Sequence, residues 1–310
     1  MTTLWVTGAN GVLGSAVVRQ AEAAGTYDRI TALGHSAVAH SATDSATEWL
    51  PLDLRDHSAI AELGRSRRPG VIINCGAMTN VDGCEDTPDL AWQINAEGPR
   101  ALARVARDAG AALLHVSTDY VFPGDEANPG PYREDDPTRP ISVYGSSKLG
   151  GEQAIMEELG SDAPWLIART AIVIGTGPNQ RPNFVTWLAR ELHAGHRVRI
   201  VTDQFNTPTL AEDLARSLLW SASAGTTGIY HTAGPTLLGR HEWALAIADH
   251  FRLSRDLIDW VTSDELKAKA RRPLRSGLRC ERLTADQARG APQFLGAVEC
   301  LGALDWGLDF

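Results

Sequence analysis

The sequence predicts an α/β protein, with a doubly wound parallel sheet followed by a smaller C-terminal α/β lobe. Over the first 170 residues, short apolar runs bounded by Gly, Pro, Asn or Asp alternate with amphipathic helical stretches, a pattern typical of repeated βαβ units. The clearest helical stretches are followed by glycines, the residue that commonly stands just after the last turn of a helix. Crossovers of this length place neighbouring strands parallel, with helices on both faces of the sheet.

The elements follow in chain order. Apolar runs predict strands at 3–7, 29–33, 71–75, 112–117 and 165–169. Helical periodicity predicts helices at 11–24 and 91–109, closed by Gly25 and Gly110. After residue 175 the alternation is looser, and we expect helices at 184–194 and 240–251 and strands at 198–202 and 228–232.

Composition and charge narrow the class of protein. The 310 residues carry a net charge of −9. This charge disfavours nucleic acid as a partner, because proteins that bind nucleic acids concentrate Lys and Arg. No apolar run approaches the ~18 residues that a membrane span requires, and the N-terminus lacks the features of a secretory signal. The four cysteines and the scattered histidines lack metal-ligand spacing. We expect a cytoplasmic protein without a metal site, with its cysteines reduced.

A glycine turn follows the first predicted strand. Gly8-Ala9-Asn10-Gly11-Val12-Leu13-Gly14 opens a helix, and glycines there permit a tight turn and close backbone approach. The free N–H groups of the helix N-terminus can then hold a pyrophosphate. A simple turn would need the same glycines, but the strand, turn and helix together indicate a Rossmann dinucleotide site. We therefore expect a nucleotide-binding domain over 1–174 with a return segment at 203–233, and a substrate lobe over 175–202 and 234–310.

The end of the second strand indicates which dinucleotide binds. An acidic residue there usually bonds the ribose 2′-hydroxyl of NAD, whereas this chain has Gly34, His35 and Ser36. We predict a preference for NADP(H), with NAD(H) possible because we expect no arginine nearby. Asp53 is either a contact for the adenine amino group or a helix cap.

Tyr144 and Lys148 lie four residues apart, on one face of a helix. A tyrosine is a poor acid–base group at neutral pH, but an adjacent cation draws its pKa down. Alone, this spacing would favour an amphipathic surface helix with Tyr144 half buried. Upstream, Ser117 and Thr118 end a buried strand, at the edge where open α/β sheets bind ligands, and Thr118 is placed to hold a substrate carbonyl or to cap the strand end.

Together, GANGVLG, STDYVF and YGSSKLGGE resemble the extended short-chain dehydrogenase/reductase family, and within it the dTDP-4-dehydrorhamnose reductase branch. Further matching segments are NCGAMTNVD at 74–82, Asn95, DQFNTPT at 203–209 and Arg272-Pro273. The resemblance implies hydride transfer from NADPH to a C4 ketone of a nucleotide sugar, with Thr118, Tyr144 and Lys148 as the catalytic group. The dehydratases of this fold carry an acidic residue where Tyr120 stands, so plain ketone reduction is expected.

The resemblance also implies the binding residues. Those expected at the cofactor are Gly8, Asn10, Gly11, Val12, Leu13, His35, Ser36, Asp53, Leu54, Gly76, Ala77, Met78, Tyr144 and Lys148. Those expected at the substrate are Thr118, Asp119, Tyr120 and Ile172. Ile172 stands where the branch carries a tryptophan against the sugar, and an aliphatic side chain cannot stack as an indole does.

Two alternatives to the nucleotide-sugar reductase stay open. One is a reductase of a different keto substrate, which the missing tryptophan permits. The other is a non-catalytic regulatory subunit, because the branch also resembles the nucleotide-binding regulatory subunit of methionine adenosyltransferase. A homodimer is possible. The Arg271, Arg272 and Arg275 cluster would either meet substrate phosphates or form a solvated surface.

Overall fold

A parallel sheet of seven strands forms the centre of the larger part of the molecule. The computed structural model describes residues 2–35, 47–161, 163–177 and 182–308. The sheet has the order β11-β6-β5-β4-β1-β2-β3, and every neighbouring pair is parallel. Its strands are β1 (Thr3–Thr7), β2 (Arg29–Gly34), β3 (Thr47–Pro51), β4 (Val71–Asn74), β5 (Ala112–Thr118), β6 (Trp165–Thr170) and β11 (Gly228–His231). This strand order confirms the doubly wound Rossmann-type fold.

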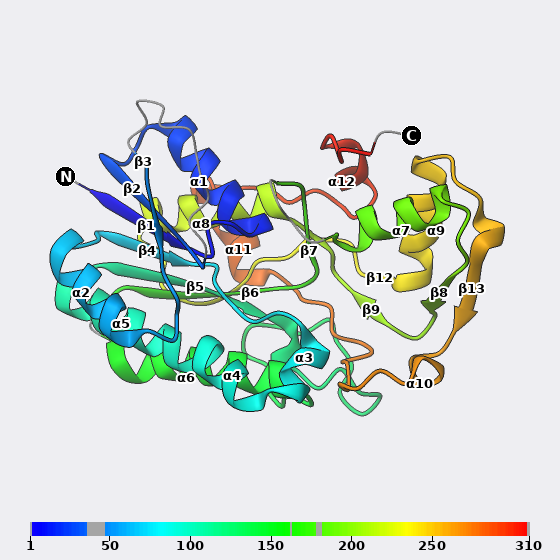
Figure 1. Cartoon of the computed structure of the whole chain (residues 1–310), viewed down its shortest axis with the longest axis horizontal. Helices are drawn as coiled ribbons and strands as arrows, with labels where there is room; N and C mark the ends of the chain where they lie inside the picture. Colours follow the sequence, from blue (N-terminus) through cyan, green and yellow to red (C-terminus); the bar gives the residue numbers. More distant parts are fainter. Residues whose placement is uncertain (1, 36–46, 162, 178–181, 309–310) are drawn as a thin grey trace.

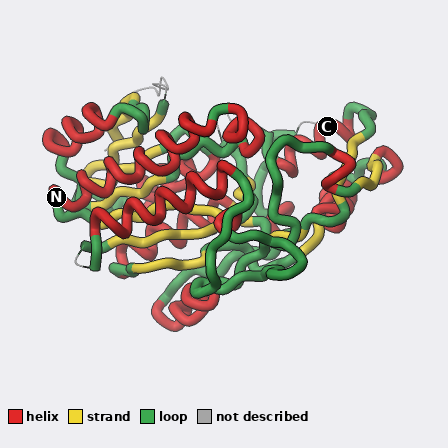
Figure 2. The backbone as a smooth tube through the Cα atoms, turned by 90° about the horizontal axis from the view of Figure 1, so that it is seen from below, coloured by secondary structure: helices red, strands yellow, loops and turns green. Residues whose placement is uncertain are grey.

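Helices cover both faces of this sheet (Figures 1 and 2). On one face, α1 (Val12–Ala24) packs beside α8 (Ala211–Ala224), with Val17 and Leu214 in their shared core. On the other face lie α2 (His57–Arg67), α5 (Gly98–Ala109) and α6 (Val143–Leu159). The buried strands are therefore apolar on both sides, which explains why they read as continuous apolar runs in the sequence.

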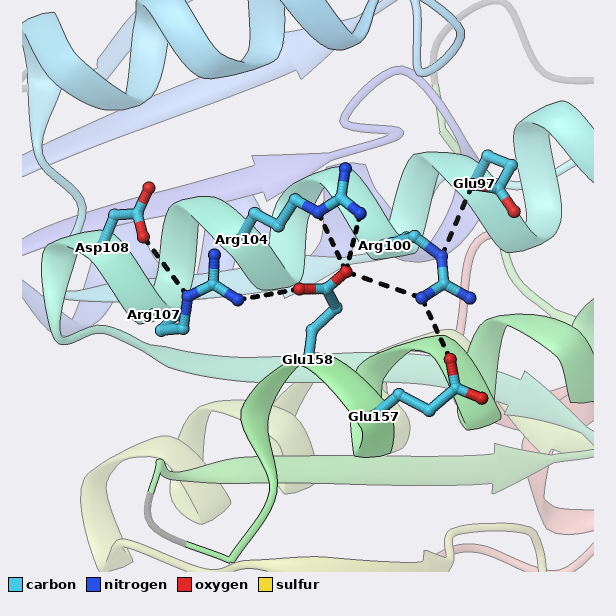
Figure 3. Close-up of polar contacts among 7 residues, drawn as sticks. All are labelled: Glu97, Arg100, Arg104, Arg107, Asp108, Glu157 and Glu158. Carbon is cyan, nitrogen blue, oxygen red and sulfur yellow. Dashed lines mark hydrogen bonds and ion pairs between the residues drawn. The ribbon is translucent and has the colours of Figure 1, made fainter.

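The outer surface of α5 and α6 carries a network of ion pairs (Figure 3). Glu158 of α6 accepts hydrogen bonds from Arg104 at 2.9 Å and from Arg107 at 2.8 Å, and its carboxylate lies 3.5 Å from Arg100. Glu157 adds a bond of 3.0 Å to Arg100. The arginine stripe of α5 is thereby neutralised by acidic residues within the same chain.

The predicted elements of the first half are recovered with small shifts, apart from one helix. The helix expected over 91–109 is interrupted: α4 (Pro88–Trp92) passes into a π-helical turn at Gln93–Glu97 before α5 begins. The sequence also did not indicate β3 or α2. β3 is a short edge strand without a continuous apolar run, and Gly64 interrupts the helical pattern of α2.

A second hydrophobic core lies at the other end of the molecule, on the right of Figure 1. It joins α7 (Phe184–His193), β8 (Val198–Val201), α9 (Arg240–His250) and β13 (Ile258–Val261) around the fully buried Trp243. The helices expected at 184–194 and 240–251 and the strand at 198–202 correspond to α7, α9 and β8. The strand expected at 228–232 is β11, which pairs with β6 in the large sheet.

Eight shorter helices and strands of the described ranges lie outside the two sets named above. They are α3 (Val81–Asp86), α10 (Ser263–Leu266), α11 (Glu281–Ala285), α12 (Glu299–Gly302), β7 (Val173–Ile174), β9 (Phe205–Asn206), β10 (Thr209–Leu210) and β12 (Leu238–Gly239). Within the described ranges, no helix is long and apolar enough to cross a bilayer, and no group of three acidic, His or Cys side chains could hold a metal ion. All four cysteines are free thiols.

Candidate active site

The glycine turn between β1 and α1 leaves no room for side chains. Gly8 has φ +64°, and a Cβ added there would lie 2.7 Å from the backbone nitrogen of Gly76. A Cβ on Gly14 would overlap the carbonyl oxygen of Gly8. Gly11 caps α1 without a side-chain hydrogen bond, and the first turn of α1 carries no acidic residue. The first amides of α1 are thus available to an anion such as a pyrophosphate.

A cavity of about 650 Å³ connects this turn with the carboxyl end of β5 and the first turn of α6. The predicted site residues that line it are Gly8, Asn10, Gly11, Val12, Leu13, His35, Gly76, Ala77, Thr118, Asp119, Tyr120, Tyr144, Lys148 and Ile172. Residues far apart in the sequence meet here because β1, β4 and β5 are neighbours in the sheet. The arrangement matches the rule that open α/β sheets bind ligands at the carboxyl ends of their strands.

A neighbouring cavity of about 620 Å³ accounts for three more predicted residues, Asp53, Leu54 and Met78. It shares Gly8, His35, Gly76 and Ala77 with the first cavity. Of the residues expected at the cofactor, Ser36 lies outside the described residues.

Arg55 corrects the expectation that no arginine stands near the cofactor edge. It lines this second cavity, and its Nε donates to Asp53 Oδ2 at 2.9 Å. The guanidinium lowers the pKa of Asp53 to about 2, so the carboxylate is charged at neutral pH. Asp53 does not cap α2, since that cap is Asp56, which accepts from the backbone N–H of Ala59 at 2.9 Å.

Tyr144 and Thr118 lie together in the first cavity. Ser142 caps α6 by accepting from Gly145 N at 3.2 Å, which places Tyr144 in the first turn of the helix. Burial raises the pKa of Tyr144 well above its usual range, although a hydrogen bond with Thr118 opposes this. The phenol is therefore protonated at neutral pH, as a proton donor to a developing alkoxide must be.

Lys148 follows one turn later on α6 and is only 2% exposed. Its Nζ donates to the carbonyl oxygen of Val116 at 2.7 Å and lies 3.3 Å from His115 Nε2. Burial lowers the pKa of Lys148 to about 8. The lysine thus lies against β5, and burial dominates the pKa of Tyr144. This differs from the expectation that the ammonium draws the tyrosine pKa down.

Asp119 and Tyr120 extend the site towards the C-terminal part of the chain. Asp119 Oδ2 accepts from Ser276 Oγ at 2.5 Å, and burial raises the pKa of Asp119 to about 6. The Tyr120 ring meets that of Tyr144 edge to face, with centroids 5.4 Å apart. The C-terminal segment therefore contacts the end of β5 at this cluster.

Comparisons with known proteins agree with this geometry. The family model described as "RmlD substrate binding domain" matches residues 1–302. The chain belongs to this family. It is 40% identical over 253 residues to a dTDP-4-dehydrorhamnose reductase of Streptomyces griseus, covering 80% of this chain and 75% of the relative. A probable low-salt glycan biosynthesis reductase of Haloferax volcanii is 36% identical over 279 residues, covering 88% of each chain.

Solved structures give the same result. A dTDP-4-dehydrorhamnose reductase of Bacillus anthracis, solved in complex with NADP, has a TM-score of 0.81 at 28% identity and covers 98% of both chains. The motif resemblance seen in the sequence is thereby confirmed at the level of the family.

In this member of the RmlD substrate binding domain family, a third cavity of about 780 Å³ opens between the two parts of the molecule. Arg240 lines it, and its guanidinium carbon lies 4.3 Å from the centroid of the Phe184 ring. No carboxylate within the described residues is paired with Arg240. Arg240 also stands close enough to Asp119 and Tyr120 to act on their charges. It is a cation that the sequence did not single out.

The arginine cluster near the C-terminus divides between structural and cavity-lining roles. Arg272 binds Asp82 at 2.8 and 3.2 Å and so ties the C-terminal segment to α3. Arg275 lies over the Phe205 ring, 5.3 Å from its centroid. Arg271 is exposed and lines the third cavity together with Arg272. The cluster is therefore neither a single phosphate clamp nor a single solvated surface.

Two further features were missed or underestimated. Asn95, in the π-helical turn, accepts from Met78 N at 2.8 Å and donates to Ser147 Oγ at 3.0 Å, so it ties the loop after β4 to α6. Its match to the family segment was the available signal. Ile172 has φ +38°, a strained conformation for a β-branched residue, at the wall of the first cavity. No feature of the sequence indicated this strain.

Proposed function

We propose that the protein reduces the 4-keto group of a nucleotide-linked deoxysugar with NADPH, as the dTDP-4-dehydrorhamnose reductases among its relatives do. One observation carries the proposal: Thr118, Tyr144 and Lys148 line the same cavity as the glycine turn. That juxtaposition is what a hydride transfer coupled to proton donation requires.

The residues around the first two cavities fit NADP(H). Gly8, Gly11 and the first amides of α1 would hold the pyrophosphate, since a side chain at Gly8 would collide with Gly76. Asp53, Leu54 and Met78 line the space for the adenosine half. Arg55 would meet a 2′-phosphate, which supports NADP(H) as the preferred cofactor with NAD(H) still possible.

The chemistry assigns each side chain one task. NADPH, when bound, supplies the hydride that adds to the carbonyl carbon. The carbonyl oxygen takes the Tyr144 proton as the C=O π bond breaks, which gives a hydroxyl group and leaves a phenolate. Lys148 holds a positive charge near that phenolate below its pKa of about 8, and Thr118 orients the oxygen.

The substrate lies, in this proposal, between Tyr144 and the third cavity. The side chains that would contact the sugar are Asp119, Tyr120 and Ile172. Arg240 would bind the charged phosphates, because a partly buried guanidinium that is not ion-paired with a carboxylate attracts an anion. We also propose that 1–174 with 203–233 binds the cofactor and that 175–202 with 234–310 binds the substrate. The separate core around Trp243 supports this division.

NADPH consumption, followed by absorbance with a panel of dTDP-4-keto-6-deoxyhexoses, tests the reductase. We expect turnover with at least one sugar, and a kcat reduced about 10²–10⁴-fold in Tyr144→Phe, which removes only the hydroxyl. Tyr27→Phe makes the same change beside α1, away from the cavities, and should leave kcat unchanged.

Three negative outcomes would replace the proposal. Turnover with other ketones but with no nucleotide sugar would indicate a different keto substrate. Bound NADPH without turnover of any ketone, together with capture of a stable catalytic partner, would indicate a regulatory subunit. Equal activity of Tyr144→Phe and wild type would remove the tyrosine from the mechanism.

The location of the protein in the cell and its oligomeric state belong to the same proposal. We place the protein in the cytoplasm, where activated sugars are reduced, and treat a homodimer as its assembly. Cell fractionation and light scattering of the purified protein test these two points separately. A membrane-bound fraction or a monomer mass would contradict the first or the second.

A further inference from the structure

A line of buried side chains runs across three neighbouring strands to Lys148. Thr7 Oγ1 donates to Asn74 Oδ1 at 2.5 Å, and Asn74 Nδ2 lies 2.9 Å from His115 Nδ1. His115 Nε2 lies 3.3 Å from Lys148 Nζ. The sheet register explains the line, because Thr7 pairs with Asn74 and Asn74 with His115 on β1, β4 and β5. All four side chains are at most 2% exposed.

The orientation of the Asn74 amide follows from a backbone group. The N–H of Gly76 lies 3.1 Å from Asn74 Oδ1, and a backbone N–H can only donate. The atom that faces it must therefore be the amide oxygen. The amide nitrogen of Asn74 is left to face His115.

This orientation determines the tautomer of His115. An amide NH₂ group only donates, so His115 Nδ1 must offer a lone pair, and a neutral ring then carries its proton on Nε2. In an imidazolium both ring nitrogens carry a hydrogen, so the Nδ1–H of His115 would face the N–H hydrogens of the Asn74 amide. Burial and the neighbouring Lys148 also hold the pKa of His115 well below its usual range.

The Nε2–H group of His115 consequently faces the amine of Lys148. An ammonium has three N–H bonds and no lone pair, whereas a neutral amine has a lone pair that accepts a hydrogen bond. We propose that Asn74 and His115 are positioning residues that act through Lys148: Asn74 holds the imidazole as the Nε2–H tautomer, and that N–H favours the neutral amine over the ammonium. The inference rests on the proposed reductase, in which the charge of Lys148 stabilises the Tyr144 phenolate.

The other titratable groups around Lys148 do not provide this control. Glu152, one turn further along α6, favours the ammonium, but its carboxylate is bound by Arg169 at 2.7 Å. Burial raises the pKa of the Cys75 thiol to about 12, so it is uncharged. Tyr144 is protonated for the same reason. The imidazole is the side chain on β5 that faces the amine and distinguishes its two forms.

The chain offers a direct measurement because Lys148, Lys267 and Lys269 are its only lysines. In protein labelled with ¹³C-lysine, each Cε signal reports one titration, and Lys267→Arg and Lys269→Arg assign the three signals. We expect the Lys148 midpoint to lie well below the other two. In Asn74→Asp, the carboxylate accepts from Nδ1–H, the ring proton moves off Nε2, and the midpoint should rise by about one pH unit or more.

The carboxylate introduced by Asn74→Asp would also raise the Lys148 midpoint directly through its negative charge. A His115→Gln background separates this charge effect from the effect of the imidazole tautomer. We expect Asn74→Asp to shift Lys148 less in the His115→Gln background than in wild type. Equal shifts in both backgrounds would show that charge acts without the ring, and would overturn the inference.

The ¹⁵N spectrum of the wild-type imidazoles tests the tautomer without altering Asn74, with the His115 signals identified by their loss in His115→Gln. An Nε2–H signal pattern is expected, and an Nδ1–H or imidazolium pattern would overturn the inference. These measurements need no turnover. Absent reductase activity with the expected tautomer and titration would therefore refute the proposed function alone. In active enzyme, the pH profile of kcat should move with the Lys148 midpoint in Asn74→Asp.

Discussion

Burial controls the charge of the two proposed proton-handling residues. It raises the pKa of Tyr144 and lowers that of Lys148, because a desolvated site disfavours whichever form is charged. Around neutral pH the tyrosine is a neutral phenol, while Lys148, with a pKa of about 8, is close to its titration range. The spacing of the pair is a sequence property, but these opposite shifts come from the packing of α6 against β5.

Arg55 should decide between the two dinucleotides. In Arg55→Ala we expect the Kd for NADPH to rise about tenfold or more, since the charge-assisted hydrogen bond from the guanidinium to the 2′-phosphate would be lost. The unpaired Asp53 would add repulsion. The Kd for NADH should change little. Fluorescence titration measures both constants, and Arg65→Ala, on the exposed face of α2, is the control. Equal losses for both dinucleotides would contradict this role.

Arg240 should act on substrate binding rather than on the chemical step. Arg240→Met keeps much of the contact with Phe184 but removes the charge, so we expect KM for the nucleotide sugar to rise about tenfold or more, with kcat changed less. Steady-state kinetics at saturating NADPH measure the split. Arg190→Met, on the exposed side of α7, should leave both values unchanged. A fall in kcat alone would place Arg240 elsewhere in the mechanism.

At the scale of elements, the helix before β5 has a structure that its sequence conceals. The residues over 91–109 read as one amphipathic helix, yet a π-helical turn at Gln93–Glu97 divides them. This turn directs Asn95 inward, where it bonds both Met78 and Ser147. Such turns recur at functional sites because they re-aim one side chain without ending the helix. Periodicity alone does not reveal them.

The contact between α2 and α5 depends on Gly64. A Cβ on Gly64 would lie 2.8 Å from both methyl groups of Val105, closer than van der Waals contact allows. We expect Gly64→Ala to lower the free energy of unfolding by about 1–3 kcal/mol.

The matched test of this contact makes room on the other helix. In a Val105→Ala background, Gly64→Ala should instead be neutral or stabilising by up to about 1 kcal/mol, because alanine favours a helix interior over glycine. Urea denaturation of the four proteins gives the coupling. An equal loss in both backgrounds would show that the clash with Val105 is not the cause.

At the scale of the whole molecule, acid should destabilise the fold through the buried His231. His231 Nδ1 lies 3.1 Å from the carbonyl oxygens of both Tyr132 and Arg279, so it carries the ring proton. Its Nε2 is buried without a hydrogen-bond partner in the described part of the chain. Burial lowers the pKa of His231 to about 3. The unfolded chain, with a histidine pKa near 6.5, therefore binds the proton first.

The contribution of the neutral His231 ring to the free energy of unfolding is fully present above about pH 6.5, and it is lost as the pH falls towards 3. We expect a slope of up to about 1.4 kcal/mol per pH unit from this one proton, on top of the other groups. His231→Asn, which keeps a donor near Nδ1, should reduce the slope between pH 6 and 4 in denaturant titrations. An unchanged slope would assign the acid sensitivity to other groups.

The sequence by itself determined the features that rest on local backbone chemistry and on periodicity. The β1–turn–α1 unit could be predicted because glycine adopts the positive φ found at Gly8 without steric cost. Tyr144 and Lys148 could be placed on one helix face because their spacing is one turn. The buried strands were recognisable because sheets covered on both faces demand apolar runs.

Only the tertiary structure decided which distant side chains meet. The approach of Arg240 to Asp119 and the contact of His115 with Lys148 depend on strand register and on how α9 and α6 pack. Charge states follow the same division. Desolvation depends on the whole surrounding fold, whereas the sequence specifies only which groups can ionise.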